Sequence, residues 1–224
     1  MMRNTISKIF LVTLLAVLPG SVFAQLPPSL VVEFDFEGFG NAVMNSPVLY
    51  AGDVTAGDPL VVGGSWWIRI DDTGWPSTST PQARWDYVFG NYFDYDPGSF
   101  SWTGVFDEHS CATAPVWELT HATNGTLGGT LIVVVTYTDW NMNGILDVDE
   151  RMLGMFSGTL IVMKYGTGLF AGYCGLGAYN GAIQNPDPAN WADEYVDGHC
   201  KLDLQDCSIG THEASWSAIK RLYR

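Results

Sequence analysis

The sequence predicts an all-β protein folded as a single jelly-roll-like β-sandwich. Three observations lead to this prediction. Short runs of aromatic and β-branched residues recur along the chain, 25 glycines interrupt them, and only one short stretch has helical spacing. A chain of 224 residues can bury a substantial core within one domain. We therefore expect one β-sandwich domain over residues 25–224.

Residues 1–24 have the features of a secretory signal peptide. Arg3 and Lys8 precede an apolar run at residues 9–18, and small residues before Gln25 mark a cleavage site. The apolar run is too short to span a bilayer, and no later run approaches the roughly 20 residues that a membrane helix needs. We expect a secreted protein, extracellular or periplasmic, without a transmembrane anchor.

The chain is strongly acidic. Its 24 Asp and Glu residues outnumber 10 Lys and Arg residues, which gives a formal net charge of -14. Loss of Arg3 and Lys8 with the signal peptide would bring this charge to -16, because -14 - 2 = -16. Such a protein repels polyanions, so nucleic acid is excluded as a partner. Excess acid is compatible with cation binding.

The first predicted strand covers residues 30–37, where acidic residues alternate with Val32, Phe34 and Phe36. Turn signals at 51–53 and 56–59 end a short second strand. The later predicted strands cover 64–71, 83–95, 100–106, 116–121 and 131–137. The last of these is nearly continuous in Ile and Val, which predicts burial on both faces.

Two nearly identical segments flank an acidic loop. Gly129-Thr-Leu-Ile-Val133 is repeated as Gly158-Thr-Leu-Ile-Val162. Both have strong strand propensity, and the sequence between them is short. We expect the two segments to be the arms of a β-hairpin with the acidic loop at its tip.

The acidic loop, residues 139–150, fills every fixed position of the pattern D-x-[DN]-x-[DN]-G-x5-E. Calcium takes six to eight oxygen ligands, and a glycine at the sixth position allows the chain to coil around the ion. Gly144 occupies that position. The predicted ligands are the side chains of Asp139, Asn141, Asn143, Asp147 and Glu150 and the backbone carbonyl of Ile145. We expect Ca²⁺ as a cofactor.

Over these twelve residues the loop resembles the calcium-binding loops of EF-hand and dockerin proteins. The resemblance implies metal binding. Such loops are normally bordered by helices, whereas this one follows a β-branched run, and dockerins carry two loops where this chain has one. Cohesin docking and calcium sensing are therefore not implied, and no full-length family is indicated.

The chain has four cysteines, an even number that favours two disulfides in an exported protein. Three pairings are open. We favour Cys200 with Cys207 and Cys111 with Cys174. The Gly-, Ala- and Asn-rich region at about 166–212 is predicted to be irregular and disulfide-containing. Residues 213–224 are predicted to form a short amphipathic helix, because their apolar side chains have helical spacing.

The function that the sequence favours is a structural or interaction role at the cell exterior, with Ca²⁺ stabilising the fold. One alternative is a carbohydrate-binding module, in which exposed aromatic residues stack on sugars. Most aromatic side chains pack in the core of a protein. The candidates for sugar stacking are therefore the tryptophans in predicted loops: Trp75, Trp140 and Trp191. Partners would be carbohydrate or other exterior proteins.

A second alternative is self-assembly through the N-terminal strand, which would complete the sheet of a neighbouring subunit and form a surface or filament protein. Enzymatic activity is less expected, since the chain has no G-x-S-x-G, H-E-x-x-H or phosphate-binding motif. We therefore name no catalytic residues. A glycoside hydrolase ranks below the binding functions, because nothing selects a catalytic pair among the acidic residues.

Overall fold

The computed structural model describes residues 27–40, 48–69, 93–106, 115–163, 165–187 and 194–207. These residues form an all-β fold, as predicted. No helix within them is long and apolar enough to cross a membrane. The elements are β1 (Ser29–Gly40), β2 (Val48–Gly57), β3 (Ser65–Arg69), β4 (Asp94–Asp96), β5 (Ser99–Phe106), β6 (Trp117–His121), β7 (Gly125–Thr138), the 3-10 helix η1 (Val148–Met152), β8 (Leu153–Val162), the 3-10 helix η2 (Gly168–Phe170), β9 (Tyr173–Gln184) and β10 (Tyr195–Asp206).

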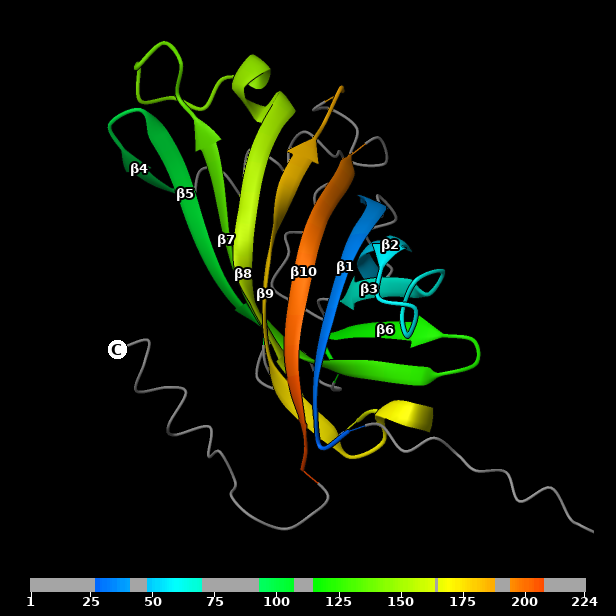
Figure 1. Ribbon diagram of the computed structural model, residues 1–224. Helices are drawn as coiled ribbons and strands as arrows, with labels where there is room; N and C mark the ends of the chain where they lie inside the picture. The colour runs from blue at the N-terminus through cyan, green and yellow to red at the C-terminus, as the bar shows by residue number, and fades with distance from the viewer. Residues whose placement is uncertain are drawn as a thin grey trace, which may run out of the picture.

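Eight of the strands close into an antiparallel barrel (Figure 1). Their order is β7-β6-β3-β2-β1-β10-β9-β8, and β8 pairs again with β7 to complete the circuit. One edge of β7 pairs with two strands, β6 and then β5. Its residues 125–129 pair with β6, and its residues 131–138 pair with β5, which carries β4 on its far side.

The predicted β-sandwich is wrong, because one sheet closes on itself in place of two sheets packed face to face. Both architectures bury alternate side chains of each strand, so the alternation seen in the sequence fits either one. The pairing of β8 with both β7 and β9 decides between them. Glycines in these strands let a long sheet coil tightly enough to close.

The hairpin prediction is confirmed. β7 and β8 align the two repeated segments antiparallel, with Gly129 opposite Val162, Leu131 opposite Leu160 and Val133 opposite Gly158. The small residue of each segment thus faces the last valine of the other. Leu131, Val135 and Tyr137 of β7 are buried, while the side chains between them are half-buried. The prediction that this strand is buried on both faces is therefore only partly confirmed.

Within the region 166–212 that was predicted to be irregular, most of the described residues lie in regular strands. β9 and β10 have twelve residues each and pair along their whole length. Small residues permit this close packing, since a Cβ at Gly177 would lie 2.2 Å from the side chain of Leu202. The turn predicted at 51–53 is wrong, because β2 runs through these small residues to Gly57. The turn predicted at 56–59 is partly confirmed, since a turn at 59–63 follows the end of β2.

Strand β1 matches its predicted alternation. Val32 and Phe34 are buried inside the barrel, whereas Glu33, Asp35 and Glu37 are exposed outside it. β1 pairs with β2 on one edge and β10 on the other. Both edges of β1 are therefore paired within its own barrel. The predicted helix at 213–224 and most of the predicted strand at 83–95 lie outside the described residues.

Candidate functional site

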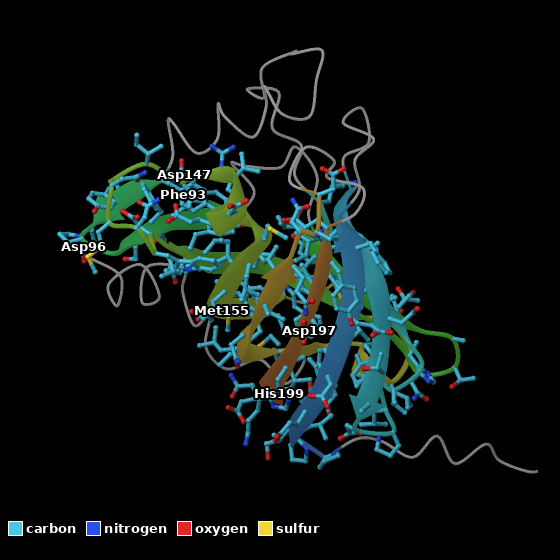
Figure 2. The ribbon with its side chains drawn as sticks, turned by 90° about the horizontal axis from the view of Figure 1, so that it is seen from above. Phe93, Asp96, Asp147, Met155, Asp197 and His199 are labelled. Carbon is cyan, nitrogen blue, oxygen red and sulfur yellow. A yellow bond between two sulfur atoms is a disulfide. The ribbon has the colours of Figure 1, made fainter. Side chains whose placement is uncertain are left out.

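The predicted calcium loop joins β7 to β8 and ends in η1. It lies at one end of the barrel beside the β4–β5 hairpin, and the backbone N–H of Asp139 donates to the carbonyl of Gly98 at 3.0 Å. Figure 2 shows Asp147 of the loop at this end together with Phe93 and Asp96, far from His199 on β10. The barrel thus anchors both ends of the loop.

The first half of the loop coils around the carboxylate of Asp139. One oxygen of this carboxylate accepts the backbone N–H of Gly144 at 2.9 Å, and the other accepts that of Asn143 at 3.3 Å. Two further turns are closed by the side-chain oxygens of Asn141 and Asn143, which accept the N–H groups two residues later. Gly144 has a φ of 73°, a left-handed conformation that favours glycine.

Glu150 holds the two ends of the loop together. Its Oε1 accepts the N–H of Trp140 at 2.8 Å, and its Oε2 accepts the N–H of Asp147 at 2.9 Å. The side chain is only 3% exposed. The final glutamate of the pattern is therefore fixed in place with both carboxylate oxygens directed into the loop.

The middle ligand candidates already touch one another. Oδ2 of Asp147 accepts hydrogen bonds from the side-chain amides of Asn141 at 2.8 Å and Asn143 at 2.9 Å. Each amide oxygen retains a second lone pair beyond the backbone hydrogen bond that it accepts. The third, fifth and ninth positions of the pattern are thus brought together by the fold.

Asp139 and Glu150 are buried carboxylates, at 1% and 3% exposure. Burial raises the pKa of Asp139, but hydrogen bonds from the Gly144 N–H, the Tyr95 hydroxyl and the Asn143 N–H lower it, and the net pKa lies below the usual value. Asp139 is therefore charged at neutral pH. A buried carboxylate without an opposite charge is unfavourable, and a cation would relieve that cost.

The donor set of this loop consists only of oxygens: three carboxylates, two carboxamides and one backbone carbonyl. This set suits a hard cation of calcium size, which takes six to eight oxygens. Within the described residues, no three carboxylate, imidazole or thiol groups already surround one point.

Three apolar side chains of the loop face solvent, whereas Leu146 is buried in the core. Trp140 is 64% exposed, Met142 74% and Ile145 62%. Trp140 is the one predicted sugar-stacking residue whose surroundings are described, and its indole is free of the core. Trp75 and Trp191 lie outside the described residues.

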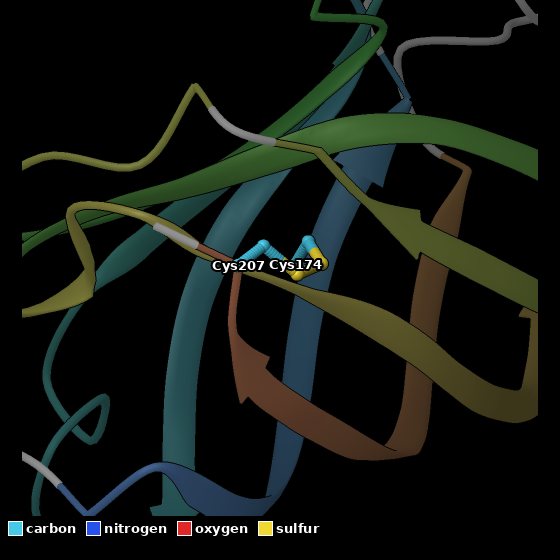
Figure 3. Close-up of a disulfide and its surroundings, with 2 residues drawn as sticks. All are labelled: Cys174 and Cys207. Atoms are coloured by element: carbon cyan, nitrogen blue, oxygen red, sulfur yellow. A yellow bond between two sulfur atoms is a disulfide. The ribbon is translucent and has the colours of Figure 1, made fainter. Parts of the chain in front are cut away.

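The predicted cysteine pairing is wrong. Cys174 is bonded to Cys207, with a Cα–Cα distance of 5.9 Å, at the end of the barrel where β9 begins and β10 ends (Figure 3). Cys200 is a free thiol buried inside the barrel, because the alternation of β10 turns it inward. Cys111 lies outside the described residues. An intrachain disulfide is typical of an oxidising extracellular or periplasmic compartment.

Sequence reasoning missed a buried acid at the start of β10. Glu194 is 1% exposed and accepts a 2.7 Å hydrogen bond from the hydroxyl of Tyr50. Burial raises its pKa to about 7, although the Tyr50 hydrogen bond acts in the opposite direction. No local signal marks this pair, because its members are 144 residues apart.

His199 contacts two acidic residues of β1, which the sequence did not predict. It lies on the outer face of β10, where Nδ1 is 2.8 Å from Asp35 and Nε2 is 3.3 Å from Glu33. Its position is therefore part of a surface charge network and not of a disulfide-rich loop.

No protein-family model matches this chain, and no curated protein or solved structure shows significant similarity to it.

Proposed function

We propose that this protein is an exported β-barrel that binds Ca²⁺ at residues 139–150 and has a binding role at the cell exterior. The observation that carries the proposal is the geometry of two buried carboxylates. Asp139 and Glu150 hold the loop backbone from its two ends, and no ion pair to either is found among the described residues. A divalent cation supplies the missing positive charge.

The ion would stabilise the end of the barrel. The loop connects β7 and β8, whose pairing closes the barrel, and it contacts the β4–β5 hairpin through Asp139. Binding that favours the native state adds RT ln(1 + [L]/Kd) to the free energy of unfolding. For a site with a Kd on the order of 10⁻⁴ M, typical of extracellular modules, millimolar Ca²⁺ adds about 1.4 kcal/mol.

Export is supported by two independent features. Residues 1–24 have the composition of a signal peptide, and the Cys174–Cys207 disulfide requires an oxidising compartment to form and persist. Extracellular calcium would keep a site of this affinity largely filled.

The test is a calcium titration of the full chain by isothermal calorimetry, together with thermal unfolding in Ca²⁺, Mg²⁺ and EGTA. We expect EGTA to lower the Tm and Mg²⁺ to restore it poorly, because Mg²⁺ retains its waters and prefers fewer protein ligands. In Asp139→Ala, EGTA should have no further effect. Asp149→Ala is the matched control, since Asp149 belongs to the same loop but occupies a non-ligand position.

Identical melting of the unmodified protein in Ca²⁺ and in EGTA would exclude the calcium site. A loss of the EGTA effect in both variants would show a general charge effect and not coordination by Asp139.

Carbohydrate binding is a second candidate function, favoured by the exposed indole of Trp140. Aromatic faces bind the apolar faces of sugar rings. A glycan array probed with the unmodified protein and with Trp140→Ala tests it, and the expected result is a glycan signal that the substitution removes. The same signal from both proteins would remove Trp140 from the site.

A further inference from the structure

A row of two apolar side chains, one tyrosine and one glutamine crosses the outside of the barrel at the end near η1. Leu153, Gln184, Tyr195 and Phe39 are successive cross-strand neighbours on β8, β9, β10 and β1. Phe39 is 58% exposed and Leu153 50%, and the Phe39 ring lies edge-on to Tyr195 at 5.3 Å. Together with Met152, Asn185 and Pro186, they line a groove of about 520 Å³.

The next row of outward residues is acidic. Glu37 on β1 lies directly opposite Asp197 on β10 and directly opposite Asp53 on β2. Like charges in directly opposite positions destabilise a sheet. The Glu37 carboxylate accepts a hydrogen bond from Tyr195 at 2.8 Å, and Asp197 accepts one from Gln184 at 3.3 Å. Both carboxylates are therefore held beside the groove.

Two other acidic residues of β1 have a basic side chain beside them, whereas the acidic residues of this row have none in the described part of the chain. Asp35 is 2.8 Å from His199, and Glu33 is 3.4 Å from Lys201. Among the described residues no ion pair reaches Glu37, Asp53 or Asp197. Figure 2 shows Asp197 and His199 in succession along β10. The row that borders the apolar groove thus has three carboxylates without a basic partner among the described residues.

Asn185 lies at the edge of the groove and has a buried carboxamide without a hydrogen-bond partner among the described residues. It lines the groove, is fully buried, and neither its side-chain nitrogen nor its side-chain oxygen has a hydrogen-bond partner. Only its backbone N–H is used, in a bond to the carbonyl of Met152. A buried polar group without a partner costs about 1–3 kcal/mol.

We propose that this surface, the acidic groove formed by Phe39, Leu153, Gln184, Asn185 and Tyr195 with the carboxylates of Glu37, Asp53 and Asp197, binds a basic amphipathic peptide segment of a partner protein. Apolar side chains of the segment pack on Phe39 and Leu153, and its Lys or Arg side chains face the three carboxylates. Charge selects this ligand class, because an anion is repelled and a neutral sugar leaves the acidic row uncompensated.

The test uses three fluorescein-labelled twelve-residue peptides and the full chain, with Ca²⁺ held constant. The first peptide carries Leu at helical spacing and Lys elsewhere, the second replaces Lys by Glu, and the third replaces Leu by Ser. We expect only the Leu/Lys peptide to bind in fluorescence anisotropy. Glu37→Gln combined with Asp197→Asn should weaken its binding by about tenfold, since each exposed pair contributes up to about 1 kcal/mol.

The matched control combines Asp94→Asn with Asp203→Asn. It removes the same two charges from exposed positions on β4 and on the far part of β10, and we expect its affinity to change by less than about twofold. Gln and Asn still accept the hydrogen bonds of Tyr195 and Gln184, so the groove variant keeps those contacts. Phe39→Ser combined with Leu153→Ser should also reduce binding of the Leu/Lys peptide.

Three results would overturn the proposal. Equal weakening in the groove variant and the control would show non-specific attraction to an acidic protein. Binding of a neutral hexasaccharide in place of the Leu/Lys peptide would assign the groove to carbohydrate. Stronger peptide binding to a Lys220→Glu, Arg221→Glu variant would identify the chain's own basic C-terminal segment as the occupant, and not a partner protein.

Discussion

The hydroxyl of Tyr50 donates a 2.7 Å hydrogen bond to the buried carboxyl of Glu194. Tyr50 lies on β2, and Glu194 immediately precedes β10, with β1 between these two strands in the sheet. The backbone carbonyl of Glu194 also accepts the N–H of Gly40 at the end of β1. A single acidic residue thus fastens three strands at one end of the barrel.

We predict that this pair makes stability fall as the pH rises. Burial raises the pKa of Glu194 from 4.5 to about 7. Because the folded-state pKa is raised, the contribution of Glu194 is fully present below pH 4.5 and is lost as the pH rises through 7. The shift of 7 - 4.5 = 2.5 units corresponds to roughly 3 kcal/mol. Glu194→Gln should therefore be up to about 3 kcal/mol more stable than the unmodified chain at pH 8.5, and nearly equal at pH 4.5.

Urea unfolding at both pH values measures this difference. Asp94→Asn, an exposed change of the same charge, is the control and should leave the pH dependence unaltered. If the Gln variant follows the same pH profile as the unmodified protein, Glu194 is not the source of the pH dependence.

Gly144→Ala should weaken calcium binding through backbone strain. Gly144 has a φ of 73°, and a Cβ there would be 3.6 Å from Tyr95, so the cost is conformational and not a clash. That cost is about 1 kcal/mol, which corresponds to about fivefold in affinity if strain disfavours the bound conformation. Calorimetric titration with Ca²⁺ measures the affinity.

Gly63→Ala is the control for this change. Gly63 has a φ of 78° and open space around it, so it carries the same backbone penalty at a site remote from the loop. We expect similar losses of stability in the two variants and unchanged calcium affinity in Gly63→Ala. Equal affinities in both would show that the left-handed turn at Gly144 has no part in ion binding.

Gly158→Ala should disrupt the pairing of β7 with β8, which closes the barrel. A Cβ at Gly158 would lie 2.0 Å from the carbonyl oxygen of Ile132 on β7 and 2.8 Å from the ring of Tyr179 on β9. Overpacking typically costs 1–3 kcal/mol, and here a backbone atom must move, so we expect about 3 kcal/mol or more. Thermal unfolding measures the loss. Ser157→Ala, at the exposed neighbouring position, should change the stability by less than about 0.5 kcal/mol.

The cysteine assignment predicts a specific pattern of thiol reactivity. Burial raises the pKa of the Cys200 thiol, so this residue should react with maleimide only after unfolding. Non-reducing peptide mapping should show Cys174 linked to Cys207 and Cys200 unlinked. Replacing both bonded cysteines by Ala should cost about 3–4 kcal/mol, because the bond closes a loop with a sequence separation of 33. A Cys200–Cys207 peptide would contradict the assignment.

Local patterns were sufficient for several parts of the fold. The alternation of Val32 and Phe34 with acidic residues predicted the faces of β1, and the repeated Gly-Thr-Leu-Ile-Val segments predicted the β7–β8 hairpin. The spacing of the residues from Asp139 to Glu150 predicted the ligand candidates, and the fold brings Asn141, Asn143 and Asp147 into contact. These features depend on residues close in sequence, so a short window contains the information.

Other features depend on which distant strands become neighbours. A sandwich and a barrel impose the same alternation, and only the pairing of β8 with both β7 and β9 distinguishes them. The Gly-rich composition of 166–212 resembled loops because local propensity disfavours glycine in strands, whereas the closed sheet has no room for side chains there.

From the sequence alone it follows that the chain is all-β, that the even-numbered face of β1 is buried, and that the acidic loop 139–150 lies at a hairpin tip. The barrel closure, the Cys174–Cys207 bond, the buried Glu194 and the acidic groove beside Phe39 became known from the folded structure. The two groups of features differ in the sequence separation of the residues that produce them. Periodicity and ligand spacing are encoded within a few residues, while strand order is set by the total burial and hydrogen bonding of segments far apart in the chain, such as Tyr50 and Glu194, 144 residues apart.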